Sequence, residues 1–567
     1  MTTRKLIVTI IAMIAASLAG AAARSDEGSG DGPRNGVEFD RTLSKIVKGK
    51  GPTDPIAAAA VAVMVGDRLV YSGAAGCAEF DAEGTACVRA FEPTSKLRVA
   101  SISKMALSMG LMSLVEQGRL DLDRDVSDYL GWRLRNPAFP DRPITARQLL
   151  SHTSSIRDPE TYWVAAPGAF QDLFDDGAAP FDDAHAPGEW FRYANLNFGI
   201  LAGVIERAGS ERFDLFMSNA AFKPMGLDVG YNWSGVSQTA RRKGAGLYSR
   251  EGDAWAPVVD APKILADNAS VFLAEEGLDR ESYLTGYELG DNPTLFSPQG
   301  GLRASAVDLA DLARALDGRE MQIAPVWRYD ADAPNGDTED GYFDAFGLGV
   351  QTVEGNRRLL PGGRLIGHGG EAYGLYSGAW LIKGDRSAED DEDVTIAYVA
   401  TGVSKSPGKG AHPTFNRLEE RLIRLGLHAA DALAEPHPFD VQADAMSDVD
   451  AALSSARNSG KRVLLALGGN WCHDSRGLAK KFATKPLKQL IDTNFELVWV
   501  DVGQRDRNLD VARRFGVEKL LGTPTVLVLS PEGQLLNADT VFDWRTADSR
   551  SMDDAISYFS AFAADPE

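Results

Sequence analysis

Ser101 and Lys104, three residues apart in the segment Val99-Ala-Ser-Ile-Ser-Lys104, have the side chains of a nucleophile and its proton acceptor. Residues three apart on a helix share one face, which would bring the hydroxyl within hydrogen-bonding reach of the amine. A serine hydroxyl becomes strongly nucleophilic only when a neighbouring base takes its proton, and the free N–H groups of a first helical turn can stabilise an oxyanion. The alternative is a helix cap followed by a solvated lysine.

The segment that follows favours the chemical interpretation. Residues 102–115 are predicted to form a helix that is apolar on nearly all sides, and Gly118 supplies its stop signal. A helix without a polar face lies in the centre of a domain. Ser101 and Lys104 would therefore stand at the start of a buried helix rather than on a surface one.

Tyr193-Ala-Asn195 precedes a predicted helix at residues 197–208. The tyrosine could accept or relay the proton of the serine, and the asparagine amide could hold a substrate carbonyl. Both residues could instead cap the helix, since asparagine is a strong N-cap.

His368-Gly369-Gly370 stands just before a predicted strand at residues 375–382. Paired glycines let a substrate lie against a strand edge and bond to its backbone. The alternative is an ordinary histidine near the end of a strand. A further segment, Leu149-Leu-Ser-His-Thr-Ser154, ends a predicted helix at 145–150 and is expected to support the site structurally.

The remaining pattern predicts one sheet with helices packed on it. Strands at 61–65 and 69–72, joined by Gly66-Asp-Arg68, have a hairpin signature. A helix at 306–316 and a strand at 394–400 follow later, and the acidic run at 389–393 is expected to be a solvated loop. A hairpin, a long helical middle and late strands indicate an α+β domain with strands from distant parts of the chain.

Three motifs occur together and in order: Ser101-x-x-Lys104, Tyr193-x-Asn195 and His368-x-Gly370. On these motifs, residues 40–430 resemble the serine β-lactamase and penicillin-binding-protein superfamily, specifically its class C β-lactamase-like branch. Leu149-Leu-Ser-His-Thr153 and Gly300-Gly-Leu-Arg-Ala-Ser305 add family-like segments outside the site. The resemblance implies an α+β β-lactamase/transpeptidase-like domain, in which a helical region flanks an antiparallel sheet.

The resemblance also implies a role for each site residue. Ser101 would be the acylated nucleophile, Lys104 the base or proton relay, and Tyr193 would share the proton transfer. Asn195 would bind the substrate's amide, and the backbone N–H groups of Ser101 and Glu371 would form the oxyanion hole. To act as a base, Lys104 must be largely neutral, which requires burial or positive neighbours to lower its pKa.

His368-Gly369-Gly370 departs from the Lys-Thr-Gly that β-lactamases and transpeptidases of this superfamily usually carry. That lysine helps to attract the carboxylate of a β-lactam or a peptide C-terminus, whereas a histidine carries less positive charge at neutral pH. We therefore expect a serine hydrolase that cleaves an ester or amide through an acyl-Ser101 intermediate. Two alternatives stay open: β-lactamase or D,D-peptidase activity on cell-wall-type substrates, and a non-catalytic binding protein with a relic site.

A new alternation of helices and strands starts after Pro436-His-Pro438. Helices are expected at 449–456 and from about 472, and strands at 463–467, 497–500 and 525–529. Trp471-Cys472 before a helix, and Gly522-Thr-Pro524 before a strand, resemble the thioredoxin fold over residues 445–567. Ser475 stands where that family has its second, resolving cysteine.

Without a partner thiol, Cys472 cannot form the internal disulfide of dithiol exchange. At a helix N-terminus it would still be a reactive monothiol able to form mixed disulfides. The alternative is a degenerate domain kept for binding or for support of the hydrolase.

Composition and charge limit the partners. The 567 residues are too many for one ordinary domain, and 59 Lys and Arg against 80 Asp and Glu give a formal net charge of −21. Such a surface repels nucleic acid, so none is expected as a partner. We expect a small-molecule ester, amide or peptide substrate, and a protein partner for the thioredoxin-like domain. No metal cluster or phosphate loop is recognisable, so no cofactor and no metal site are implied.

The first residues have the pattern of an export signal. Arg4 and Lys5 precede an apolar run from Leu6 to about Leu18, and small residues follow at 21–23. An uncleaved membrane anchor is the alternative, although the run is short for a span. We expect export, to the periplasm, with no membrane span after cleavage. The expected parts are a signal peptide at 1–23, a flexible lead-in at 24–37, a serine hydrolase domain at 38–433, a linker at 434–444 and a thioredoxin-like domain at 445–567.

Cys77 and Cys87 flank a turn-like stretch at residues 81–84. In an exported protein these two residues could form a disulfide across a hairpin. Two buried thiols are the alternative. Cys472 is the third and last cysteine of the chain.

Overall fold

The computed structural model describes residues 36–49, 54–175, 180–260, 280–383, 393–434 and 438–563. The expected signal peptide at 1–23, most of the lead-in at 24–37 and most of the acidic run at 389–393 lie outside these residues. The chain divides into two compact units, Met1–Ala430 and Asp431–Glu567. In the described ranges, no helix combines the length and the apolar character that crossing a membrane requires.

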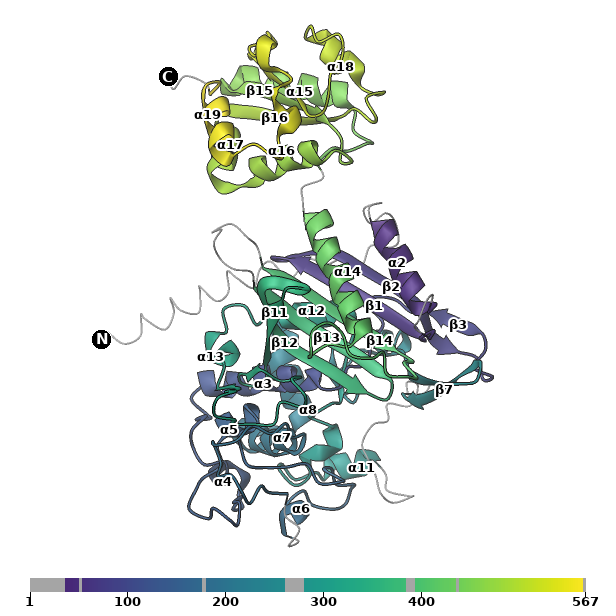
Figure 1. Ribbon diagram of the computed structural model, residues 1–567, viewed down its shortest axis with the longest axis vertical. Helices are drawn as coiled ribbons and strands as arrows, with labels where there is room; N and C mark the ends of the chain where they lie inside the picture. The colour runs from purple at the N-terminus through teal and green to yellow at the C-terminus, as the bar shows by residue number, and fades with distance from the viewer. Residues whose placement is uncertain are drawn as a thin grey trace, which may run out of the picture. The chain divides into compact units, whose positions relative to one another are not determined.

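A nine-stranded antiparallel sheet forms the centre of the first unit (Figure 1). Its order is β3-β2-β1-β14-β13-β12-β11-β10-β9, with β1 at Ala58–Val65, β2 at Arg68–Phe80, β3 at Cys87–Ala90, β9 at Trp327–Arg328, β10 at Ala345–Phe346, β11 at Gln351–Asn356, β12 at Leu359–Ala372, β13 at Leu375–Lys383 and β14 at Val394–Thr401. The early hairpin β1–β2 joins the late strands because β1 pairs with β14, Ala62 facing Ala397. The expected sheet, built from distant parts of the chain, is confirmed.

Helices cover both faces of this sheet (Figure 1). Every residue of β1 is buried; its even-numbered residues belong to the main core, to which α3 (Ile102–Glu116) and α12 (Ala306–Arg314) contribute. On the other face lies α14 (Arg417–Ala434), where Gly426 packs closely against Ile396 of β14. The helix α2 (Val37–Val47) contacts β1 and β2.

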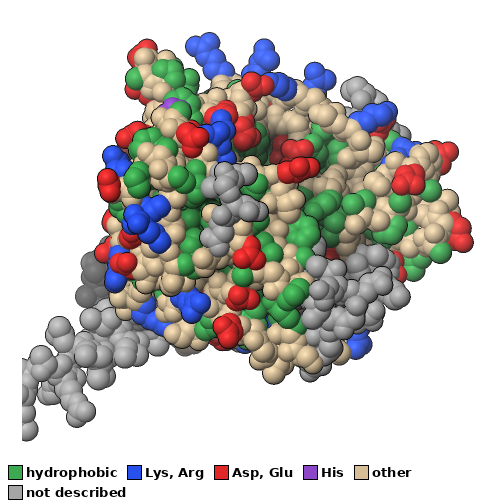
Figure 2. All heavy atoms as spheres, turned by 90° about the horizontal axis from the view of Figure 1, so that it is seen from below, with side chains coloured by type: hydrophobic (Ala, Val, Ile, Leu, Met, Phe, Trp, Pro, Cys, Tyr) green, Lys and Arg blue, Asp and Glu red, His purple; other side chains and the backbone are tan. Residues whose placement is uncertain are grey.

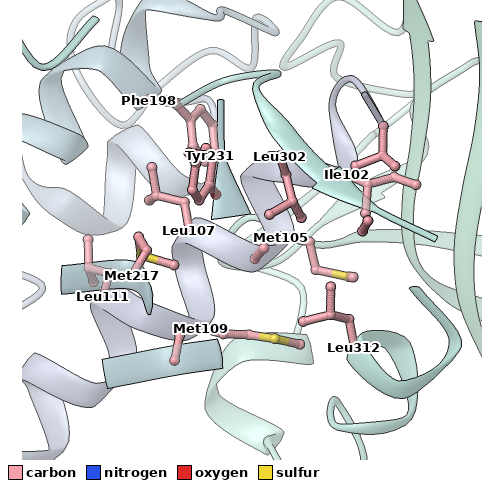
Figure 3. Packing of buried hydrophobic residues seen from close by; sticks show 14 of the residues in the cluster. Ile102, Met105, Leu107, Met109, Leu111, Phe198, Met217, Tyr231, Leu302 and Leu312 are labelled. Atoms are coloured by element: carbon pink, nitrogen blue, oxygen red, sulfur yellow. The ribbon is translucent and has the colours of Figure 1, made fainter. Parts of the chain in front are cut away.

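The helix α3 is the buried helix that the sequence predicts at 102–115. Apolar neighbours surround it on several sides, as Figure 3 shows for Leu107 near Tyr231 and Met109 near Leu312. It contacts α7 (Leu196–Gly209) and the π-helix η2 (Met217–Phe222). Gly118 ends this stretch with φ +68°, a conformation that glycine adopts without strain.

The other elements of the first unit are short. They are β4 (Leu97–Arg98), α4 (Ser127–Leu130), α5 (Ala146–Leu150), α6 (Asp172–Asp175), α8 (Phe213–Phe216), η3 (Lys223–Met225), β5 (Gly230–Tyr231), α9 (Gln238–Arg242), β6 (Leu247–Glu251), β7 (Ala254–Val259), α11 (Arg280–Thr285), η4 (Pro293–Phe296), β8 (Leu302–Ala304) and α13 (Glu320–Ile323). A small sheet, β4-β8-β5, leads directly into α3. Cys77 on β2 and Cys87 on β3 form a disulfide, the first of the two arrangements considered for this pair.

The second unit has a three-stranded sheet in the order β16-β15-β17. The strands are β15 (Arg462–Gly468), β16 (Phe495–Asp501) and β17 (Thr525–Leu529), and the helices are α15 (Ala445–Ser459), α16 (His473–Ala483), α17 (Lys485–Asn494), α18 (Leu509–Arg514) and α19 (Met552–Ser560). β15 runs parallel to β16 and antiparallel to β17. Alternate residues of β15 join two separate cores, so helices cover both faces, as a thioredoxin-like fold requires.

Candidate active site

The turn before α3 presents Ser101 at the start of that helix. Ala100 has φ +49°, a backbone conformation that is uncommon for a residue other than glycine. Ser103 fixes the turn from behind, because its hydroxyl donates to Ala100 O at 2.6 Å and accepts from Leu302 N at 2.9 Å. The local geometry thus places a partly exposed hydroxyl at the edge of a buried core.

Lys104 is completely buried and points at Ser101. Its Nζ donates to Ser101 Oγ at 2.9 Å, to Asn195 Oδ1 at 2.8 Å and to the Gln299 carbonyl oxygen at 3.0 Å. An ammonium group has three donors, and these three contacts use all of them. The solvated-lysine alternative is therefore wrong for Lys104.

Burial lowers the pKa of Lys104 from its ordinary value of 10.5 to about 7. The positive charge of Arg98 lowers the pKa further, while the carboxylate of Asp158 opposes the shift. About half of the Lys104 side chains are then neutral at pH 7. This meets the requirement that a lysine must lose its proton before it can act as a base.

A pH dependence follows from this lowered pKa. The rate of Ser101 acylation should fall about tenfold per pH unit below about pH 7, because a protonated Lys104 cannot accept the serine proton. Labelling rates with a fluorophosphonate between pH 5 and 9 measure this, with circular dichroism at each pH as the control for folding. A rate that stays level across this range would contradict the assignment of Lys104 as the base.

Tyr193 lies on the other side of the lysine amine. Lys104 Nζ is 4.9 Å from the centre of the Tyr193 ring, and the Tyr193 hydroxyl is hydrogen-bonded to Ser101. His152 stacks on this ring with a centroid distance of 4.3 Å, which is the supporting role expected for the segment at 149–154. Burial raises the pKa of Tyr193, so its phenol keeps its proton and can relay one.

The side chain of Asn195 contacts Lys104 and Asp158. It is the N-cap residue of α7 but makes no side-chain capping bond there, so the helix-cap alternative is wrong. Its Oδ1 accepts from Lys104, and its Nδ2 donates to Asp158 Oδ2 at 2.9 Å. One of its two amide hydrogens is thus already used within the protein, and binding of a substrate amide by Asn195 stays a prediction.

Asp158 is a residue of this site that the sequence does not reveal. Its carboxylate accepts from the backbone N–H groups of Asn195 at 2.9 Å and Leu196 at 2.8 Å, besides the Asn195 amide. A carboxylate at the N-terminus of α7 is stabilised by the helix dipole. It caps the helix in place of the asparagine and fixes the amide that holds Lys104.

The strand β12 brings His368, Gly369 and Gly370 to the start of α3. These residues pair with Ala379, Gly378 and Ser377 of β13. A Cβ atom at Gly370 would lie 2.6 Å from Val99 O and 3.2 Å from Ser101 N, so only glycine lets the strand approach this closely. Glu371 follows at once, and its carboxylate accepts from Tyr376 Oη at 3.0 Å.

His368 is buried and uncharged. Burial, aided by the charge of Lys104, lowers its pKa to about 3. Its Nδ1 is hydrogen-bonded to the Gly369 carbonyl oxygen, and its buried Nε2 has no hydrogen-bond partner among the residues that the structure describes. The ring centroid lies 6.1 Å from that of Tyr193. At neutral pH this position therefore supplies no positive charge to a substrate.

An open cavity of about 590 Å³ begins at Glu371. Its walls are Glu371, Ala372, Tyr373, Gly374, Tyr376 and residues 403–406. On the face drawn in Figure 2 the surface carries both acidic and basic side chains, and it is hollowed between acidic and hydrophobic ones. The cavity adjoins the strand that carries the expected oxyanion N–H group.

In the second unit, Cys472 is the N-cap residue of α16 and is 7% exposed. Its Sγ donates to the Thr523 carbonyl oxygen at 3.4 Å, and the bond from Thr523 to Pro524 is cis. Ser475 is buried, and within the described ranges its hydroxyl has no hydrogen-bond partner. The three residues expected at a thioredoxin-like site are thus placed at one end of α16 and the loop before β17.

A family model described as beta-lactamase matches residues 39–419, more than half of the chain. The chain therefore belongs to the beta-lactamase and penicillin-binding-protein-like family of serine hydrolases. A second model, described as thioredoxin-like, matches residues 444–531. Both parts of the expected fold are confirmed.

Protein flp of Staphylococcus aureus (strain N315) is 28% identical over 195 residues, which are 34% of this chain and 38% of that protein. Penicillin-binding protein 4* of Bacillus subtilis (strain 168) is 27% identical over 172 residues, 29% of this chain and 35% of that protein. The chain thus spans well under half the length of these curated relatives. Among solved structures, the octameric penicillin-binding protein homologue from Pyrococcus abyssi is 15% identical with a TM-score of 0.47, covering 76% of this chain and 83% of that one.

Proposed function

We propose that the protein is an exported serine hydrolase that cleaves an ester or amide through a covalent acyl-Ser101 intermediate. The observation that carries this proposal is the 2.9 Å contact between Ser101 Oγ and the buried amine of Lys104, whose pKa is lowered to about 7. A neutral amine at hydrogen-bond distance is what a serine needs to become a nucleophile at neutral pH.

In the proposed reaction, Ser101 Oγ attacks the substrate carbonyl carbon while its proton passes to Lys104 Nζ. The negative charge that develops on the carbonyl oxygen is stabilised by the N–H groups of Ser101 and Glu371. The tetrahedral intermediate collapses, the bond to the leaving group breaks, and the proton passes through Tyr193 to the departing oxygen or nitrogen. A water molecule then attacks the acyl-Ser101 ester and gives a proton to Lys104. When the bond from the acyl carbon to Ser101 Oγ breaks, Lys104 returns that proton to Ser101 Oγ and the acid leaves.

Two active-site probes test this function and separate its alternatives. The full chain is incubated with a fluorophosphonate and with a fluorescent penicillin, beside the Ser101→Ala variant. Serine-dependent labelling by the phosphonate alone supports an esterase or amidase site. Labelling by both probes favours β-lactamase or D,D-peptidase activity. If neither probe labels the protein, the proposed hydrolase function is contradicted and the alternative of a non-catalytic binding protein remains.

Export is supported by the Cys77–Cys87 disulfide, since such bonds persist in oxidising compartments. Residues 1–23 also support export, because basic residues are followed by an apolar run and then by small residues, the pattern of a signal peptide. We propose the periplasm as the destination.

For the thioredoxin-like domain we propose binding or support of the hydrolase rather than thiol exchange. Cys472 is buried, and its thiol proton is donated to Thr523 O. Iodoacetamide should therefore alkylate Cys472 at least about tenfold more slowly in the folded chain than in urea. Because Cys77 and Cys87 form a disulfide, Cys472 is the one free thiol among the described residues, and the assay measures its alkylation. Alkylation in the folded chain at the rate seen in urea would favour the monothiol alternative.

A further inference from the structure

Arg98 is a buried guanidinium that forms no ion pair with any of the described residues. It lies on β4, three residues before Ser101, and is 8% exposed. Among the residues that the structure describes, none forms a hydrogen bond with its buried Nε. Burial and the nearby Arg303 lower its pKa only to about 10, so Arg98 stays charged at neutral pH.

Asp260, a carboxylate that acts on the charge of Arg98, is already bound to another residue. Arg303 of β8 lies opposite Arg98 of β4 in the small sheet. Its guanidinium donates to both carboxylate oxygens of Asp260, at 2.8 and 2.9 Å. The same guanidinium also donates to Asn232 Oδ1 and to the Gly301 carbonyl oxygen. The charge of Arg303 is therefore paired, while no described residue forms an ion pair with Arg98 beside it. A buried cation without a counter-ion is costly, and buried polar groups without partners call for an explanation.

The position of Arg98 relative to the reacting groups suggests a reason for its buried charge. Its Nη2 lies 3.4 Å from where a Cβ atom at Gly300 would stand, and the residue before Gly300 is Gln299, which holds Lys104. The Tyr373 ring packs over the guanidinium, 5.2 Å from Arg98 Cζ, and Tyr373 also lines the cavity that begins at Glu371. Arg98 thus lies between the segment that holds the base and the turn after the expected oxyanion strand.

We propose that Arg98 binds a carboxylate of the substrate, with Gly300 and Tyr373 as two walls of this subsite. It would supply, from β4, the positive charge that the uncharged His368 does not provide on β12. The inference rests on the proposed hydrolase function and narrows it to esters or amides that carry a carboxylate near the scissile bond. A guanidinium suits this task because its planar array of donors matches both carboxylate oxygens.

Two pairs of substrates test this with the full chain. For the acyl side, the p-nitrophenyl monoester of glutaric acid is compared with p-nitrophenyl pentanoate. For the leaving-group side, a benzoyl-glycine ester of glycolic acid is compared with the ester of glycolamide. In the wild type, kcat/KM should favour the charged member of one pair. The comparison is made at about pH 9, where Lys104 is largely neutral even without the charge of Arg98. There Arg98→Gln should lower kcat/KM for that charged member about a hundredfold and change its neutral partner less than about threefold.

Labelling of Ser101 by a neutral fluorophosphonate is measured on each protein in parallel. A labelled wild type without preference for either charged member would overturn the Arg98 subsite and leave the hydrolase intact. An unlabelled wild type would overturn both proposals. Equal losses for charged and neutral members in Arg98→Gln would identify a structural residue and overturn the subsite. Arg98→Lys should recover part of the preference, and the wild-type comparison stands even if a variant does not fold.

Discussion

The Ser101→Ala variant should lose covalent labelling by a fluorophosphonate, with a rate at least about 10⁴-fold below that of the wild type. The reason is that, in the described part of the chain, Ser101 has the one hydroxyl that is hydrogen-bonded to the Lys104 amine; the other two Lys104 contacts are Asn195 Oδ1 and the Gln299 carbonyl oxygen. Stopped-flow or gel-based labelling rates measure this loss.

Ser113→Ala is the matched control for this variant. Ser113 lies on the same helix, and its hydroxyl donates to the Gly110 carbonyl oxygen at 2.7 Å, away from the site. Its labelling rate should equal that of the wild type. If Ser101→Ala kept the wild-type rate, the probe would be reacting with another nucleophile and the assignment of Ser101 would be wrong.

Lys104→Met should lower the rate of Ser101 acylation by about a thousandfold, because methionine fills similar space but cannot accept a proton. Removing the amine also removes three hydrogen bonds, two of them to side-chain oxygens and one to a backbone carbonyl oxygen. Some loss of stability should therefore accompany the loss of rate. Labelling rates and thermal unfolding, measured on the same preparations, separate the two effects.

Lys96→Met is the control for loss of a buried lysine. Lys96 is 6% exposed and pairs with Asp308 at 2.7 Å, without contact to Ser101. It should reduce stability and leave the labelling rate per folded molecule unchanged. Equal labelling rates in Lys104→Met and Lys96→Met would show that Lys104 is structural.

Local pattern was enough to predict several parts of this molecule. The helix expected at 102–115 is found at Ile102–Glu116, and the strand expected at 525–529 is found at Thr525–Leu529. These segments are predictable because the signal for each lies in consecutive residues. For the helix the signal is a long run of apolar residues, and for the strand it is a short run rich in β-branched residues between two turns. The hairpin at Gly66 follows the same rule.

Interactions between distant segments were not predictable from pattern. Asp158 caps α7 and orients Asn195, yet it lies 37 residues earlier in the chain. The low pKa of His368 arises from burial against Lys104, which no spacing of residues encodes. In the sequence Arg98 resembles an ordinary strand residue, and the structure adds that Asp260, a carboxylate that acts on its charge, is paired with Arg303. Site chemistry depends on such long-range contacts.

The most direct measurement is the mass of the protein trapped during turnover of p-nitrophenyl acetate. Acid quenching followed by trypsin should release the peptide Val99–Lys104 carrying one acetyl group, and fragmentation should place that group on Ser101. An acetyl group on Lys104 would instead block cleavage after this residue. An unmodified peptide 99–104, with acetyl found elsewhere during turnover, would contradict the acyl-Ser101 intermediate.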